Sequence, residues 1–215
     1  MSAAQSPLRL EPLELMPVGD RAALVEVADN DHVQSLSLAA RARWGGELAE
    51  LVAGERTLLI VWRGPRPTLA AVLAELRAVT VVPQEELAGR LLVIGVRYDG
   101  ADLRQVARLT GLRPDEVVAL HTAPQYTVAF IGFAPGFGYL RGGDPRLAVP
   151  RLVTPRERVA AGSVAIAAGY SAVYPTDSPG GWQILGHTEA VMFDPDRDPP
   201  VLLEPGTRVR FEAIG

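Results

Sequence analysis

The segment FIGFAPGFGYL (residues 130–140) contains three glycines, three phenylalanines, a proline and a tyrosine, a mixture that neither a regular helix nor a regular strand favours. Glycine allows sharp backbone turns and close approach of a ligand to the main chain, and aromatic rings supply flat apolar walls. The pattern is typical of a pocket rim and also of a tight aromatic corner in a β-barrel. Because glycines separate Phe133, Phe137 and Tyr139, we favour the pocket wall.

The overall composition is that of a globular protein. The chain has 215 residues, 48% of them hydrophobic, which is enough for one large domain or two small ones. It has no apolar run of membrane-spanning length, and its first residues lack the pattern of a signal peptide, so we expect a cytoplasmic protein that does not associate with membranes. The absence of cysteine excludes thiol nucleophiles and disulfides, and a net charge of −4 argues against broad nucleic-acid binding.

The basic residues are all arginine, 21 in number, and the sequence contains no lysine. The chain therefore has no phosphate-loop lysine, no Schiff-base lysine and no biotin-bearing lysine. Any phosphate must be held by arginine, by helix N-termini or by backbone N–H groups.

The first half alternates between two kinds of pattern. Strand-like patterns occupy residues 13–19, 22–28, 47–54 and 57–64, and helical patterns occupy residues 31–44 and 68–79. We predict a small α/β domain over residues 1–87. Thr68 is expected to cap the second helix, and His32 in the first helix is expected to be solvated.

The second half, residues 88–215, reads as a mostly β domain. A strand is expected at residues 90–98 and two short helices within residues 102–121, followed by short strands separated by glycine and proline, as in barrels. The two helices have the spacing of a helix-turn-helix motif. However, Asp115 and Glu116 would face phosphates at the start of the second helix, so we interpret the pair as structural.

Four motifs in the second half carry a family resemblance. They are VRYDGADL (96–103), GFAPGFGYL (132–140), PRERVAAGSVAI (155–166) and YPTDSPGGWQILGHT (174–188). In this order they resemble the family that contains the B-type subunit of 5-oxoprolinase, the kinase inhibitor KipI and the first subunit of allophanate hydrolase. The resemblance covers residues 91–215, and the first half has the expected size and element order. It implies an α+β fold, with a ferredoxin-like α/β domain followed by a cyclophilin-like β-barrel.

The resemblance also implies an activity that needs other subunits. Family members are similar to one half of a carboxyltransferase-like unit, and the oxoprolinase members act with that partner, the C-type subunit of 5-oxoprolinase, and with a third subunit. They open 5-oxo-L-proline to L-glutamate at the expense of ATP. We expect ATP, together with Mg²⁺, as a co-substrate of the complex, and no covalently bound cofactor. Two alternatives stay open: a KipI-like inhibitor of a sensor histidine kinase, and a subunit of a urea carboxylase or allophanate-processing system.

The proposed route phosphorylates the lactam oxygen, so the protein has mainly to position a phosphoryl group and balance its charge. Arg151, Arg156 and Arg158 are candidates for this role, unless the partner carries the phosphate chemistry. We assign candidate catalytic roles to His121, His187 and Arg158. His187 stands where relatives commonly have arginine, and His121 is expected at a helix end that suits an imidazolium.

The expected substrate-binding residues lie in the unusual motifs, and we predict no metal site. They are Phe133, Pro135, Gly136, Phe137, Tyr139, Arg151, Ser178, Gly180, Gly181, Trp182 and Thr188. An open aromatic rim of this kind is seldom left exposed to water. We therefore expect the partner to cover the faces around residues 133–139 and 178–182, which places the active site between chains.

Overall fold

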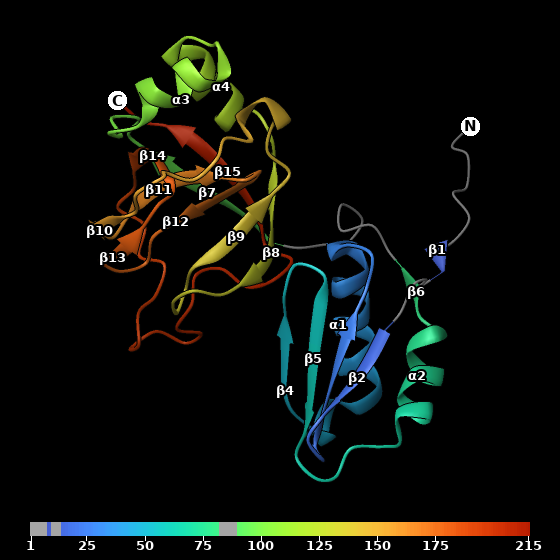
Figure 1. Cartoon of the computed structure of the whole chain (residues 1–215). Coiled ribbons are helices and arrows are strands. Elements are labelled where there is room, and N and C mark those ends of the chain that lie inside the picture. The colour runs from blue at the N-terminus through green and yellow to red at the C-terminus, as the bar shows by residue number, and fades with distance from the viewer. Residues whose placement is uncertain (1–7, 10–13, 82–89) are drawn as a thin grey trace. The chain divides into compact units, whose positions relative to one another are not determined.

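The computed structural model describes residues 8–9, 14–81 and 90–215. The chain divides into two compact units, Met1–Ala88 and Gly89–Gly215 (Figure 1). The predicted boundary between residues 87 and 88 lies outside the described residues. Within those residues, no helix is both long and apolar enough to cross a lipid bilayer.

The strands and helices expected in the first unit are confirmed. They are β2 (Glu14–Val18), β3 (Ala22–Glu26), α1 (Asn30–Trp44), β4 (Leu48–Ala53), β5 (Thr57–Trp62) and α2 (Leu69–Arg77), with a short 3-10 helix η1 (Gly45–Glu47). A separate two-stranded sheet pairs β1 (Leu8–Arg9) with β6 (Thr80–Val81). As predicted, the Thr68 side chain accepts a hydrogen bond from Ala71 N and caps α2.

The four-stranded sheet has the order β2-β3-β5-β4 and is antiparallel throughout. Strand β5 alternates, with Leu58, Ile60 and Trp62 buried in the core that α1 and α2 share. The edge position beside β3 is taken by β2, which precedes β3 in the chain, and not by a strand that follows α2. This is the ferredoxin-like arrangement with one edge strand supplied from the N-terminal side.

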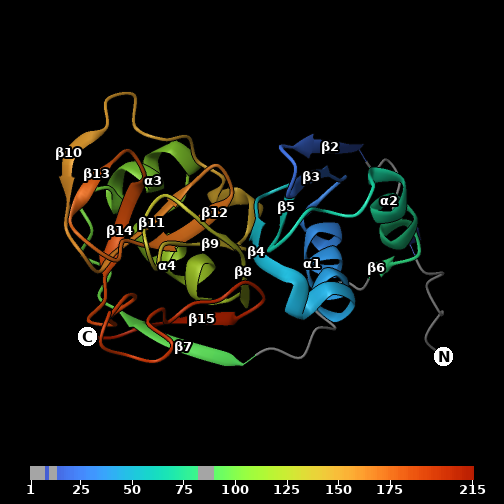
Figure 2. The ribbon, with the colours of Figure 1, turned by 90° about the horizontal axis from the view of Figure 1, so that it is seen from below.

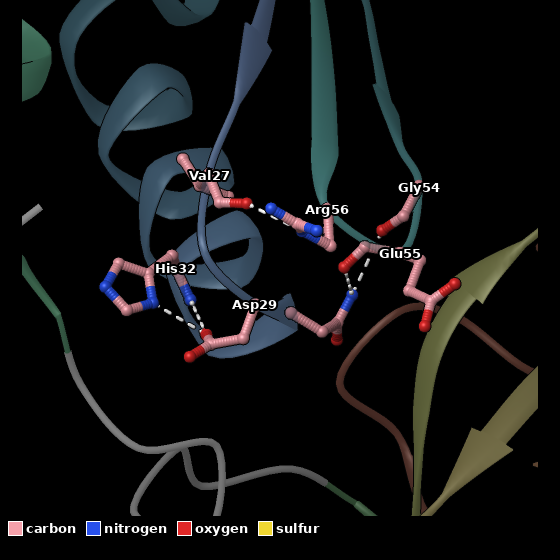
Figure 3. Close-up of polar contacts among 7 residues, drawn as sticks. Val27, Asp29, His32, Gly54, Glu55 and Arg56 are labelled. Carbon is pink, nitrogen blue, oxygen red and sulfur yellow. Dashed lines mark hydrogen bonds and ion pairs between the residues drawn. The ribbon is translucent and has the colours of Figure 1, made fainter. Parts of the chain in front are cut away.

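The turn into α1 is fixed by side chains, as Figure 3 shows. Asp29 caps the helix by accepting from His32 N at 3.1 Å, and its Oδ1 lies 2.6 Å from His32 Nδ1. Asn30 Nδ2 donates to Gly54 O at 3.0 Å, and Arg56 Nε donates to Val27 O at 3.2 Å, which tie the turn to the β4–β5 hairpin. His32 is only 7% exposed, so the expectation that it is solvated is wrong.

The second unit contains the predicted strand, the two helices and a series of short strands. They are β7 (Leu91–Val96), α3 (Leu103–Thr110), α4 (Pro114–Thr122), β8 (Tyr126–Ile131), β9 (Gly138–Arg141), η3 (Pro145–Leu147), β10 (Arg156–Val159), β11 (Ser163–Ala167), β12 (Tyr170–Val173), β13 (Ser178–Gly180), β14 (Gln183–His187) and β15 (Arg208–Ala213). Helices α3 and α4 lie together over one end of the sheet (Figure 1), where they share an apolar cluster with Ile166 and Leu185.

Seven of these strands form a sheet that closes into a barrel, which confirms the predicted cyclophilin-like architecture. The strand order is β14-β11-β12-β9-β8-β15-β7. Strand β15 runs parallel to β7 along its whole length, beside it in Figure 2. The two edge strands meet at a bridge between Arg97 and His187, where each backbone N–H donates to the other's carbonyl at 2.9 Å. This bridge is the seam of the barrel.

The seam has no room for a side chain at Gly186. A Cβ atom there would lie 2.0 Å from the carbonyl oxygen of Arg97, a distance that real Cβ atoms do not reach. Glycine at this position is therefore required by the close approach of two backbones.

The barrel sheet is apolar on both faces. Its interior holds one cluster that includes Val164, Val173 and Leu140, and its outer face holds another that includes Ala165, Ala172 and Phe137. Small alanines on the outer face leave room for large rings. Strands β10 and β13 pair with each other as a two-stranded ribbon, and side chains from this ribbon region, Val159 and Trp182, join the outer cluster.

Candidate functional site

A cavity of about 80 Å³ lies on the outer face of the barrel sheet. Seven predicted substrate-binding residues line it: Phe133, Phe137, Tyr139, Arg151, Gly180, Gly181 and Trp182. They come from β9 and the loop before it, from the segment before β10, and from the end of β13 with the turn that leads to β14. The structure therefore brings together two of the four motifs and Arg151, which are separate in the sequence.

The walls of the cavity are aromatic rings in edge-to-face contact. The centroid of the Phe137 ring lies 5.1 Å from that of Tyr139, 5.3 Å from that of Tyr174 and 5.5 Å from that of Trp182. Phe137 is 2% exposed and Trp182 is 5% exposed, so both rings belong to the outer-face core as well as to the wall. The two interpretations left open for the aromatic segment, pocket wall and packed corner, thus apply to the same rings.

Phe133 differs from the other wall residues because it is exposed and strained. Its side chain is 61% exposed, and its φ of 67° lies in the left-handed region, which bulky residues rarely adopt. The ring lies edge-on to Phe137, with centroids 5.2 Å apart. A strained backbone that presents an exposed aromatic ring at a cavity is characteristic of a functional position.

We expect two substitutions at Phe133 to distinguish the contribution of its ring from the contribution of its strained backbone. Both Phe133→Gly and Phe133→Ala remove the ring from the cavity wall and should weaken ligand binding in the cavity equally. Only glycine relieves the left-handed strain, so Phe133→Gly should be more stable than Phe133→Ala by about 1 kcal/mol. Chemical denaturation of the two variants measures this difference, and equal stabilities would contradict the assigned strain.

Arg151 supplies the positive charge at the cavity. Its Cζ lies 5.9 Å from the centroid of the Trp182 ring, an arrangement in which the ring stabilises the cation. Among the residues that the structure describes, no carboxylate forms an ion pair with Arg151. The guanidinium is therefore available to an anionic ligand.

The other two candidate arginines are already paired. Arg156 Nη2 donates to Asp102 Oδ1 at 2.7 Å, and Asp102 is 3% exposed. Arg158 is exposed and forms an ion pair with Asp177, to which its Nε donates at 2.8 Å. Asp177 also accepts from Ala161 N at 2.9 Å. Both arginines thus hold the β10–β13 ribbon in place, and Arg158 is not among the residues that line the cavity.

Four other predicted binding residues also lie outside the lining. Pro135 is exposed, Ser178 Oγ donates to Thr176 O at 3.3 Å, and Thr188 Oγ1 accepts from Ala190 N at 3.2 Å. Gly136 is buried with a φ of 81°, and a Cβ there would lie 2.9 Å from the Cβ of Phe193. Glycine at 136 is therefore explained by loop geometry and packing, and not by space for a ligand.

His121 is a buried structural residue. It is 0% exposed and stacks on Phe211 with ring centroids 4.6 Å apart. Its Nδ1 lies 2.7 Å from the Tyr98 hydroxyl and its Nε2 lies 2.8 Å from Ser171 Oγ. Burial lowers the pKa of His121 to about 3. The expected imidazolium at the end of α4 is therefore wrong, because the ring is neutral at physiological pH.

His187 lies at the barrel seam and does not line the cavity. Its Nδ1 is 3.1 Å from Asp99 Oδ1, and its side chain is 44% exposed. The ring is thus positioned by a residue of the VRYDGADL motif. The structure does not bring it together with His121 or with the aromatic cavity.

Tyr174 is the main cavity residue that sequence reasoning missed. It opens the motif YPTDSPGGW and lines the cavity together with Pro179. Its ring is 2% exposed, and burial raises the pKa of its hydroxyl, against the opposing effects of a hydrogen bond from the Trp182 backbone N–H and of Arg151 nearby. Its position in the same motif as Gly180, Gly181 and Trp182, three predicted binding residues that line the cavity, was the available signal.

Comparison with known proteins agrees with this architecture. A family model described as "Carboxyltransferase domain, subdomain C and D" matches residues 13–203. The chain is 40% identical over 168 residues to the B-type subunit of 5-oxoprolinase from Escherichia coli O157:H7, and the match covers 76% of this chain and 77% of that protein. It is 42% identical over 143 residues to the corresponding subunit from Bacillus subtilis (strain 168), covering 65% of this chain and 60% of the relative.

A solved structure shows the same fold within a longer chain. The crystal structure of TTHA0988 matches 91% of this chain with a TM-score of 0.77 and 34% sequence identity, and the matched part is 40% of that chain. The family model spans both units of the present structure. The chain therefore belongs to the family of carboxyltransferase domains of the subdomain C and D type, together with the B-type subunits of 5-oxoprolinase that it resembles.

Proposed function

We propose that this chain is a subunit of an ATP-dependent 5-oxoprolinase and forms the active site together with a carboxyltransferase-like partner. The observation that supports the proposal most directly is the aromatic cavity, in which Arg151 has no ion-pair partner among the described residues, in a chain whose curated relatives are B-type subunits of 5-oxoprolinase. An aromatic box with one cation suits a small organic anion such as 5-oxo-L-proline.

The chemistry needs activation of a poor electrophile. Transfer of the γ-phosphoryl group of ATP to the lactam oxygen releases ADP and turns that oxygen into a leaving group. Water then adds to the same carbon, the bond from carbon to the ring nitrogen breaks, and the nitrogen takes a proton, which leaves an acyl phosphate. A second water hydrolyses this acyl phosphate and releases inorganic phosphate and L-glutamate. On this chain, Arg151 would balance the negative charge of the substrate, and the aromatic rings would exclude water from the reacting carbon.

The residues that the structure describes do not fit a nucleotide bound with Mg²⁺. A cavity of about 80 Å³ is small for a nucleotide, since pockets for drug-sized ligands have roughly 300–1,000 Å³. Among the described residues, no group of three or more His, Asp or Glu side chains is arranged to hold a metal ion. We therefore place ATP and its Mg²⁺ on a partner subunit, with this chain presenting the lactam to it.

The partner is proposed to cover the open side of the cavity. Phe133 is 61% exposed at its rim, and Val153, two residues from Arg151, is fully exposed. Exposed apolar side chains around a functional cavity are characteristic of interfaces. The shared site would then be completed only in the complex.

Reconstitution tests this function. The purified chain alone should not hydrolyse ATP in the presence of 5-oxo-L-proline, whereas co-expression with a carboxyltransferase-like subunit and a third subunit should restore 5-oxoproline-dependent ATP hydrolysis and glutamate formation. Hydrogen exchange should show protection of residues 133–139 and 178–182 in the complex. The matched control is the same complex prepared without this chain, which should be inactive.

Three outcomes would contradict the proposal. Turnover by the single chain would remove the need for a shared site. A complex that processes urea or allophanate, and not 5-oxo-L-proline, would favour the urea-processing alternative. Binding to a sensor histidine kinase without any turnover in the complex would favour the KipI-like inhibitor.

A further inference from the structure

The hydroxyl group of Tyr174 is held at one place on the cavity wall. Its ring packs edge-on against Phe137, with centroids 5.3 Å apart. A Cβ atom at Gly180 would lie 2.2 Å from the hydroxyl oxygen, so the hydroxyl lies directly against the backbone of the β13 turn. The phenol is therefore positioned by packing and does not sample alternative directions.

The Tyr174 hydroxyl retains a proton to donate. Burial raises its pKa above the ordinary value, so the group is a neutral phenol at physiological pH. The hydroxyl has no hydrogen-bond acceptor among the residues that the structure describes, and Tyr174 lines the cavity. A ligand bound in the cavity can supply this acceptor.

Arg151 lies on the same cavity and complements this donor. Its guanidinium is one of two arginine charges that lower the pKa of the Tyr174 hydroxyl, the other being that of Arg156. The guanidinium is planar and lies over the Trp182 ring. A neutral donor and a cationic fork that line one cavity match the two oxygens of one carboxylate, and the surrounding rings match a flat apolar body.

We infer that the cavity is a subsite for a small planar ring carboxylate, whose carboxylate oxygens are bound by the Tyr174 hydroxyl and the Arg151 guanidinium. The inference deepens the proposed function, on which it rests for the identity of the substrate. It assigns Tyr174 as a specificity-determining residue that selects the carboxylate. A neutral ligand of similar shape would leave both groups without a partner, which is the usual basis of strong discrimination.

The test compares two lactams in the assembled enzyme. One is 5-oxo-L-proline, and the other is 2-pyrrolidinone, which has the same ring without the carboxylate. Tyr174→Phe removes one oxygen atom and keeps the ring. It should raise KM for 5-oxo-L-proline roughly 10- to 100-fold and leave kcat nearly unchanged, because the lost hydrogen bond is to a charged group that does not react. The preference for 5-oxo-L-proline over 2-pyrrolidinone should narrow by the same factor.

Two further variants keep the assignment falsifiable. Arg151→Gln should reduce the preference for 5-oxo-L-proline over 2-pyrrolidinone by at least as much as Tyr174→Phe does. In the double variant this preference should fall by less than the product of the two single reductions, because both groups bind the same carboxylate. Tyr170→Phe on β12 and Arg113→Gln just before α4 are matched controls outside the cavity lining and should keep the wild-type preference. An unchanged preference in both Tyr174→Phe and Arg151→Gln would overturn the inference.

A binding measurement distinguishes this inference from the proposed function. Calorimetric titration of the isolated wild-type chain with 5-oxo-L-proline, with benzoate and with 2-pyrrolidinone should show binding of the two carboxylates only, and Tyr174→Phe should weaken it. Carboxylate binding that depends on Tyr174 in a chain that never supports 5-oxoproline turnover would sustain the inference and overturn the function. Turnover of 5-oxo-L-proline by the complex, together with ligand binding that does not depend on the carboxylate, would sustain the proposed function and overturn the inference.

Discussion

Replacing Gly186 with alanine is expected to open the barrel at its seam. The added Cβ would lie 2.0 Å from the Arg97 carbonyl oxygen and 2.9 Å from the Arg97 carbonyl carbon. These are backbone atoms, so no side chain can rotate away to relieve the clash. The strands must separate, and the two Arg97–His187 backbone hydrogen bonds are then lost. We expect a loss of stability of about 3 kcal/mol or more.

Urea denaturation and hydrogen exchange measure this effect. Gly186→Ala should lower the unfolding midpoint, and exchange should rise first in the peptides that cover β7 and β14. Gly132→Ala is the matched control in the same unit, because its Cβ would meet only the Tyr139 ring, at an ordinary 3.6 Å, and its φ is not left-handed. Equal midpoints for the two variants would show that the seam tolerates a wider spacing.

The second large effect is a pH dependence of stability that comes from His121. Burial holds its folded-state pKa at about 3, below the ordinary value of 6.5. As the pH falls below 6.5, the unfolded chain binds a proton that the folded chain does not bind, so the free energy of unfolding decreases. The slope should be about 1.4 kcal/mol per pH unit, which amounts to about 2 kcal/mol between pH 6.5 and pH 5. Above pH 6.5 this contribution to stability is fully present.

The His121 effect is isolated by comparing three proteins across this pH range. His121→Gln should be less stable at pH 7.5 but should have a flatter dependence on pH. Tyr98→Phe removes one hydrogen bond to the same imidazole and should lower stability while it keeps the wild-type slope. Parallel curves for the wild type and His121→Gln would mean that the imidazole is accessible to protons in the folded chain.

The sequence predicted those parts of the fold that are encoded locally. Helix α2 has its periodicity and its Thr68 cap within one short segment, and β5 shows the alternation of a half-buried strand. The parallel pairing of β7 with β15 joins segments more than a hundred residues apart and leaves no local signal. The short strands separated by glycine and proline were consistent with a barrel, and the family resemblance implied the cyclophilin-like barrel that this pairing completes.

The sequence predicted most residues that line the candidate site, but it did not predict the role of every residue. Phe137 and Trp182 were found because glycines beside aromatic residues are unusual in any chain. Tyr174 was missed because its place at the cavity depends on Gly180, whose lack of a side chain admits the hydroxyl. The protonation of His121 was mispredicted because its burial comes from Phe211 and Ser171, which belong to strands distant in sequence.

The place of β15 within the sheet also sets the order in which the barrel can form during synthesis. This strand, residues 208–213, lies between β8 and β7, although both of these neighbours are made long before it. Until β15 leaves the ribosome, β7 has no ladder partner along its length and β8 lacks one of its two neighbours. The apolar interior therefore stays incompletely covered until β15 is made, so the nascent chain is most exposed to aggregation in the interval between the synthesis of β14 and that of β15.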